Sequence, residues 1–127
     1  MRYLSVEEIE FIHDQIISEI GGAKGIREPG MLVSISQKPK VDFGGIELYS
    51  DVFTKAAALF EGICNYHVFI DGNKRTSAIC MYRFLWINGY QLIATNKQLE
   101  SYTMHIAMRN PDLNKVASWI KKHSRER

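Results

Sequence analysis

This sequence has few cysteines, no long apolar run and only a small net charge. The two cysteines among 127 residues each lie within an apolar stretch, which predicts free buried thiols in a reducing compartment instead of a secreted disulfide framework. No apolar run approaches the roughly 20 residues of a membrane span, and the first residues mix acidic and apolar positions, unlike a signal peptide. A formal net charge of +2 does not indicate a general nucleic-acid binder. We therefore expect a cytoplasmic protein that binds neither membranes nor nucleic acids directly.

The length and composition indicate one domain with a substantial core. A chain of 127 residues has the usual size of a single domain, and such a domain buries roughly two-thirds of its unfolded surface. The 46% content of hydrophobic residues does not point to a disordered tail. No internal repeat, low-complexity segment or linker interrupts the chain, so we predict a single domain over residues 1–127.

Local signals predict an all-α fold of about six helices. Ser5 and Glu8 form a capping box in front of a helix over residues 6–20. The residues expected to face the core from this helix are Ile9, Ile12, Ile16 and Ile20. His13 lies near that face, and we expect it to be a packed or surface residue. Five further helices are predicted over residues 29–37, 52–66, 73–88 and 96–109, and from Asn110-Pro111 onward, the last ending in a basic, solvated tail.

The densest group of polar residues is the segment 67–76, His-Val-Phe-Ile-Asp-Gly-Asn-Lys-Arg-Thr, which connects two strongly apolar helices. We expect Asp71 or Asn73 to cap the second helix, which places Lys74 and Arg75 in its first turn. A cation there is disfavoured by about 0.3–1 kcal/mol, because it faces the positive end of the helix dipole. Two cations at this position are explained if an anion shares the site, and free N–H groups at a helix start favour phosphate. The segment therefore predicts a polyphosphate-binding junction.

The other side chains of this segment indicate chemistry on a phosphoryl group. Asp71 is a hard oxygen ligand suited to Mg²⁺, which commonly uses one or two carboxylates together with substrate phosphates. His67 precedes the anion site and can act as a general base near neutral pH. Gly72 would let the backbone approach a ligand closely. From residue types alone, a second interpretation stays open, in which these residues are a loop histidine, a helix cap and surface charges.

The pattern His67-x-Phe69-x-Asp71-Gly72-Asn73-Lys74-Arg75 resembles the signature of the Fic/Doc family, in particular its Doc (death-on-curing) toxin branch. The general Fic pattern reads H-x-F-x-[DE]-G-N-G-R-x-x-R. This sequence has Lys74 in place of the second glycine and Ala78 in place of the second arginine, and both differences are typical of Doc toxins. Further similarity to Doc proteins is seen at residues 25–30, 43–45, 56–59 and 88–90.

The resemblance implies a helical fold and the transfer of part of a nucleotide to a protein hydroxyl. It assigns His67 as the base, Asp71 as the Mg²⁺ ligand, and Gly72, Asn73, Lys74 and Arg75 as phosphate contacts. Most Fic enzymes transfer AMP, whereas Doc toxins are protein kinases that transfer the γ-phosphate of ATP and act on a translation elongation factor. Lys74 favours the kinase. The alternatives are an AMP transferase and a non-enzymatic module that binds only nucleotide or antitoxin.

Two further expectations follow from the family. Many Fic proteins carry an inhibitory helix with the pattern [S/T]-x-x-x-E-[G/N]. Here Glu61-Gly62 has Ala57 four residues before the glutamate, where the pattern requires serine or threonine, so we expect a separate antitoxin protein as partner.

The segments 41–43 and 46–48 alternate around two glycines, which predicts a two-residue β-hairpin. It is either an ordinary surface hairpin or a flap beside the active site that captures the substrate by strand pairing. The residues of this proposed flap are Phe43, Gly44, Gly45, Ile46 and Glu47.

Overall fold

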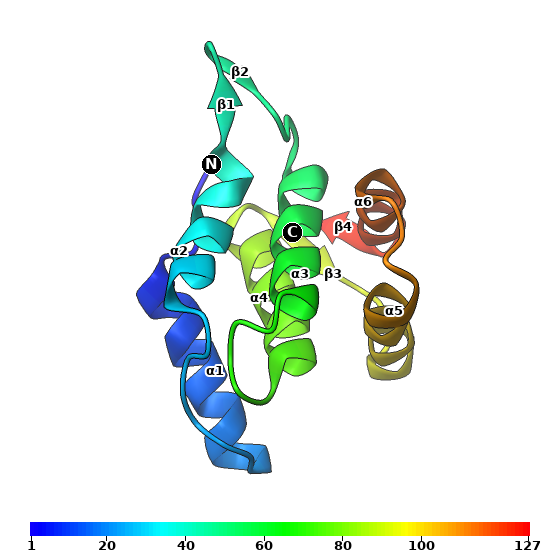
Figure 1. The fold of residues 1–127 in the computed structure, drawn as a ribbon. Coiled ribbons are helices and arrows are strands. Elements are labelled where there is room, and N and C mark those ends of the chain that lie inside the picture. Colours follow the sequence, from blue (N-terminus) through cyan, green and yellow to red (C-terminus); the bar gives the residue numbers. More distant parts are fainter.

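The computed structural model describes residues 1–127 and is mostly helical, with two small antiparallel sheets (Figure 1). The predicted all-α class with about six helices and a small hairpin is thereby confirmed. In chain order the elements are α1 (Val6–Ile20), α2 (Pro29–Gln37), the 3-10 helix η1 (Lys38–Lys40), β1 (Asp42–Phe43), β2 (Ile46–Glu47), α3 (Val52–Asn65), α4 (Asn73–Ile87), β3 (Tyr90–Leu92), α5 (Asn96–Arg109), α6 (Leu113–Lys122) and β4 (Ser124–Glu126). No helix combines the length and the hydrophobicity that a transmembrane segment needs.

Helices α3 and α4 form an antiparallel pair at the centre of the fold (Figure 1). Helices α1 and α2 cover one side of this pair, and α5 and α6 cover the other. Ten of the 14 residues of α3 are buried, as its apolar sequence predicts. The largest fully buried apolar side chains are Ile9, Leu32, Ile35, Leu59, Phe60, Ile63, Phe69, Met81, Phe84, Leu85 and Ile106. Full burial of each such side chain contributes about 1.5–3 kcal/mol to folding.

Side-chain caps explain where several helices begin. The capping box of Ser5 and Glu8 is present as predicted, and α5 has an equivalent pair in Thr95 and Gln98. The start of α6 differs from the prediction, because the helix begins at Leu113 and not at Asn110-Pro111. Asn110 ends α5 in the left-handed conformation, with φ of 44°, so the chain turns there and a new helix starts only after the next two residues.

The buried face of α1 is rotated from the predicted one. The buried residues are Ile9, His13 and Ile17, whereas Ile20 is 54% exposed. The spacing of the isoleucines placed Ile20 inward, and a histidine is not usually expected in a core. His13 is buried nevertheless, since its ring stacks on Phe69 and forms a hydrogen bond with a backbone carbonyl. A polar side chain whose hydrogen bond is formed can therefore occupy the buried face of a helix, where the apolar periodicity alone predicts an isoleucine.

The C-terminal residues are mostly exposed, as the sequence predicted, but they form a strand and not a free tail. β4 pairs antiparallel with β3, so that Gln91 lies opposite Arg125. The guanidinium of Arg127 donates to the carbonyl oxygen of Trp86 at 2.8 Å and lies 4.3 Å from the centre of the Trp86 ring. These contacts use the basic side chains as packing groups, because the long stem of an arginine can cover apolar surface while its head forms hydrogen bonds.

Both ends of the chain are attached to the turn that follows α4. The backbone N–H of Arg2 donates to Asn88 Oδ1 at 2.8 Å, and Asn88 Nδ2 donates to the carbonyl oxygen of Arg2 at 2.8 Å. The backbone N–H of Arg127 donates to the carbonyl oxygen of Gly89 at 2.9 Å. Two adjacent residues thus hold the N-terminal and the C-terminal segments at the same end of α4.

Strands β1 and β2 form the predicted hairpin, with Phe43 opposite Ile46. Gly44 and Gly45 have φ angles of 60° and 86°, as a two-residue turn of this kind requires. Phe43 and Ile46 are 69% and 75% exposed, so most of the surface of the tip faces solvent.

The base of the hairpin is fixed by a buried lysine. Lys55, on the first turn of α3, is 1% exposed, and its ammonium donates to the carbonyl oxygen of Pro39 at 2.8 Å and to Glu47 Oε1 at 3.0 Å. A buried ammonium needs such partners, because an isolated charge in a core is strongly disfavoured. Lys55 therefore connects η1 and β2 to the central helix.

Candidate functional site

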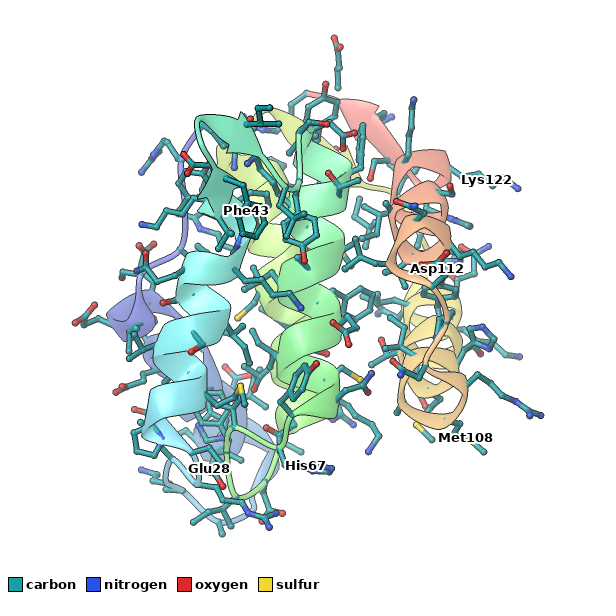
Figure 2. All side chains as sticks on the ribbon, turned by 45° about the horizontal axis from the view of Figure 1, so that its top comes forward. Glu28, Phe43, His67, Met108, Asp112 and Lys122 are labelled. Atoms are coloured by element: carbon teal, nitrogen blue, oxygen red, sulfur yellow. The ribbon has the colours of Figure 1, made fainter.

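The polar segment singled out by the sequence forms the loop between α3 and α4 and the first turn of α4. This loop lies at one end of the central helix pair, where Figure 2 shows His67 near Glu28. Val68 and Phe69 are buried at 0% and 1% exposure, and they anchor the loop in the core. His67, Asp71, Lys74 and Arg75 are exposed around them. The loop therefore presents its polar side chains to solvent, while the buried side chains of Val68 and Phe69 fix its backbone.

Backbone hydrogen bonds join this loop to the segment before α2. The carbonyl oxygen of Val68 accepts from the N–H groups of Arg27 and Glu28 at 2.8 and 3.1 Å, and the N–H of Ile70 donates to Gly25 at 3.2 Å. Residues 25–28 thus act as a short partner strand for the loop. This pairing gives the similarity at residues 25–30 a structural reason, since that segment supports the site directly.

Asn73 closes the loop through its side chain. Its Oδ1 accepts from the N–H of Phe69 at 2.9 Å, and its Nδ2 donates to the carbonyl oxygen of Phe69 at 2.9 Å. Both ends of the amide are therefore occupied within the loop. A phosphate contact from Asn73 would fall to its backbone N–H, while its side chain determines the shape of the loop.

The N-cap of α4 is Gly72, and neither Asp71 nor Asn73 caps the helix as predicted. Gly72 has a φ of 78°, in the left-handed region that glycine adopts without strain. A Cβ at this position would lie 3.2 Å from Ile17 Cδ1 and 3.7 Å from His13 Nε2, so the absent side chain faces α1. The glycine is thus required for the turn and for packing against α1.

The positive N-terminal end of the α4 dipole has no anionic partner in the protein. The first N–H of this helix with a partner is that of Thr76, which donates to Gly72 at 3.0 Å, and the N–H groups of residues 72–75 donate to no group in the protein. Lys74 and Arg75 take part in no ion pair. Free N–H groups, the helix dipole and two unpaired cations all favour an anion at this junction.

Asp71 is held at one oxygen only. Its Oδ2 accepts from the backbone N–H of Ala23 at 2.7 Å, while Oδ1 has no hydrogen-bond partner. No group of three or more His, Cys, Asp or Glu side chains comes together anywhere in the structure. A cation at Asp71 would therefore need oxygen ligands other than a cluster of carboxylates.

His67 has an unusual backbone for a residue other than glycine. Its φ is 49°, a left-handed conformation that costs an L-residue about 1–2 kcal/mol. The residue is exposed, and its ring forms no hydrogen bond with the protein. Strain of this kind is concentrated at functional sites, and here it accompanies the side chain assigned as the base.

His13 and Ala23 are the site residues that sequence reasoning did not identify. His13 Nε2–H donates to the carbonyl oxygen of Asp71 at 2.7 Å, and its ring stacks on Phe69 with centroids 3.8 Å apart. His13 was expected only to be packed or exposed. A histidine within the apolar stripe of a helix is only a weak signal for a functional residue. Nothing in the sequence indicates that His13 contacts Asp71, which lies 58 residues later in the chain.

The proposed flap does not lie beside this site. The hairpin precedes the N-terminus of α3 and the loop follows its C-terminus, and Figure 2 shows Phe43 and His67 at opposite ends of that helix. Fourteen residues of helix separate them by about 21 Å at 1.5 Å per residue. The expected adjacency is therefore incorrect, because a rigid helix holds the two segments apart.

The two cysteines are free and buried, and neither takes part in the site. Burial raises the pKa of the Cys64 thiol, although the side chain of Ser77 and the charge of Lys74 act in the opposite direction. Burial alone raises the pKa of the Cys80 thiol well above its ordinary value. Both thiols are thus kept protonated and unreactive at neutral pH.

Comparison with known proteins agrees with this geometry. The Fic/DOC family matches residues 3–85, which include α1, the loop and most of α4. Toxin Doc of Mycolicibacterium smegmatis is 34% identical over 100 residues, which is 77% of each chain. Protein kinase doc of Escherichia phage P1 is 30% identical over 122 residues, which is 96% of this chain and 95% of the relative. Because both the family match and these relatives cover the loop–helix junction, the chain belongs to the Fic/DOC family.

Proposed function

We propose that this protein is a Doc-type kinase toxin, which transfers the γ-phosphate of ATP to a serine or threonine hydroxyl of a target protein. The observation that carries the proposal is the start of α4, where free backbone N–H groups and the exposed cations Lys74 and Arg75 follow His67 by a few residues. The name Protein kinase doc, carried by a relative that matches almost the whole chain, supports this chemistry. Lys74 also supports it, since the family resemblance associates this lysine with a pose that presents the γ-phosphate.

Each exposed group of the junction has a distinct role in this reaction. The four free N–H groups of residues 72–75 and the side chains of Lys74 and Arg75 bind the phosphates and neutralise charge that develops during transfer. His67 takes the proton of the acceptor hydroxyl as its oxygen bonds to the γ-phosphorus. The bond from that phosphorus to the β–γ bridging oxygen breaks, and ADP leaves with the bonding electrons.

The residues present are compatible with Mg²⁺ as a cofactor of this reaction. Asp71 offers one oxygen with no hydrogen bond, and Mg²⁺ commonly takes one carboxylate together with substrate phosphates and water. A bound Mg²⁺ would supply neutralisation of the phosphate charges. The lack of a larger acidic cluster fits this arrangement, because the nucleotide itself provides the remaining ligands.

The proposed physiology follows the relatives. A toxin of this kind acts with a separate antitoxin, and the name Toxin Doc given to one relative supports such a pairing. By resemblance the target is an elongation factor such as EF-Tu, and its phosphorylation would arrest translation and growth. The sequence contains no inhibitory helix of the Fic type, which supports an inhibitor on another chain.

Labelled ATP tests the proposal directly. Purified protein is incubated with a bacterial lysate and ATP labelled at either the α- or the γ-phosphate, and labelled proteins are separated by size. Transfer of the γ-label is expected, at the size of the target. Transfer of the α-label would instead establish an AMP transferase, and absence of both labels would leave a binding module.

Matched histidine variants identify the base. His67→Ala should lower the rate of transfer by about 10²–10⁴ while nucleotide binding is kept, the usual range for loss of a positioned base. His105→Ala is the control, since His105 is also an exposed histidine but lies on α5. Equal activity in both variants would reject His67 as the base.

A further inference from the structure

His13 is a buried histidine that joins α1 to the site through a single backbone atom. It is 1% exposed, its Nε2–H donates to the carbonyl oxygen of Asp71 at 2.7 Å, and its ring plane lies 7° from that of Phe69. Its Nδ1 lies 3.6 Å from Asp14 Oδ1. A carbonyl oxygen only accepts hydrogen bonds, so the proton must be on Nε2.

This contact fixes the orientation of the peptide between Asp71 and Gly72. All peptide bonds of the chain are trans, and in a planar trans peptide the C=O and N–H groups point in opposite directions. Because His13 holds the oxygen toward α1, the N–H of Gly72 points away from α1. This N–H is the first of the four free donors at the start of α4.

The side chain of Asp71 is held from the same side. Ala23, in the connection after α1, donates its N–H to Asp71 Oδ2 at 2.7 Å. Gly72 packs against the same face of α1, where a Cβ would lie 3.2 Å from Ile17 Cδ1 and in ordinary contact, at 3.7 Å, with His13 Nε2. α1 and its following loop therefore hold the main chain and the carboxylate of Asp71 together.

We propose that His13 is a positioning residue of the site, which aims the free N–H of Gly72 and the carboxylate of Asp71 by holding the Asp71 carbonyl. The proposal rests on the proposed function, because it assumes that Mg²⁺·ATP binds at this junction. His13 does not touch the reacting atoms in this role. It acts only through the loop, in the way that partners of metal ligands orient them.

Two variants of His13 separate the hydrogen bond from the packing. His13→Phe keeps a ring that can stack on Phe69 but has no donor for Asp71, whereas His13→Gln keeps a donor but has no ring. His123→Phe is the control: His123 also stacks on an aromatic ring, that of Trp119, and also bonds a backbone carbonyl, but it follows α6. Binding of Mg²⁺·ATP is measured by calorimetry in a His67→Ala background to prevent turnover.

The expected result is weaker binding of Mg²⁺·ATP by about tenfold in His13→Phe, with His13→Gln within about threefold of the parent. His123→Phe should bind as the parent does, although all three changes lower the melting temperature. A His13→Phe protein that binds like the parent, or a His13→Gln protein that binds no better than His13→Phe, would overturn the proposal.

A measurement on the unsubstituted protein covers the case in which His13→Phe does not fold. The buried Nε2–H should give a slowly exchanging imidazole proton signal in NMR spectra, which shifts when Mg²⁺·ATP is added, because a phosphate bound at Gly72 polarises the same peptide. An unchanged signal with bound nucleotide would overturn the positioning role. Absence of any Mg²⁺·ATP binding by the parent would overturn the proposed function itself, which is a separate and recognisable outcome.

Discussion

Replacing His67 by glycine should stabilise the fold while removing activity. The backbone of His67 has a φ of 49°, which costs about 1–2 kcal/mol in an L-residue and almost nothing in glycine. Glycine loses about 0.5–1 kcal/mol through the greater freedom of the unfolded chain. The ring is exposed and forms no hydrogen bond, so its removal adds little. The difference predicts a gain of about 0.5–1 kcal/mol in the free energy of unfolding.

Urea unfolding of three proteins measures this effect. The parent, His67→Gly and the control His105→Gly are compared at the same pH, with the midpoint and the slope fitted separately. His105 is exposed within α5, so the same substitution should destabilise that variant by about 0.3–0.5 kcal/mol, the difference between the helix propensities of histidine and glycine. The two histidine-to-glycine changes thus have opposite expected signs, although they alter the composition in the same way.

A loss of stability in His67→Gly equal to that in His105→Gly would refute the reasoning. It would mean that the left-handed backbone carries no strain or that the ring has contacts that offset it. A gain of stability together with loss of transfer would instead place His67 among residues whose conformation is retained for function at the expense of stability.

Three further predictions concern the loop, the hairpin and the buried thiols. Asn73→Ala should lower the free energy of unfolding by about 1–3 kcal/mol, because both hydrogen bonds to Phe69 are lost; a change below about 0.5 kcal/mol in urea unfolding would contradict this. Lys55→Ala should speed hydrogen exchange in residues 42–47 by about tenfold or more, since it releases the hairpin base, and Mg²⁺·ATP affinity should not change; a shift in affinity would show unexpected coupling. Burial raises the pKa of Cys80, so the folded protein retains a proton that the unfolded chain loses, and stability should fall above about pH 9 by at most about 1.4 kcal/mol per pH unit from this group. Urea unfolding between pH 8 and 10 should show a shallower fall in Cys80→Ala, and equal slopes would rule out this contribution.

Local sequence signals predicted the helices and the loop–helix junction at residues 67–76 well. The capping box at Ser5 and the glycine pair at residues 44–45 act within a few residues, so their structures can be read from the chain alone. The exposed cations at Lys74 and Arg75 were also recognisable, because a charge at the wrong end of a helix is a local anomaly.

The features that depend on distant segments were missed. His13 meets Asp71 across 58 residues, and strand β4 finds its partner more than 30 residues earlier in the chain. Neither partner leaves a periodic signal. The cap of α4 was misassigned for a related reason: Asp71 has an acceptor side chain suited to capping, but Ala23 from another segment occupies it. The position of the hairpin could have been predicted, since the intervening helix fixes its distance from the loop.

The attachment of both chain ends to Asn88 and Gly89 has a practical consequence for labelling. A fluorescent donor on one end and an acceptor on the other would remain close together, and both would lie a full length of α4 from the loop between α3 and α4, about 22 Å for its 15 residues. Energy transfer between such dyes should therefore be insensitive to ligand binding. It would report the opening of the far end of α4, so that unfolding can be followed in the same sample in which nucleotide is titrated.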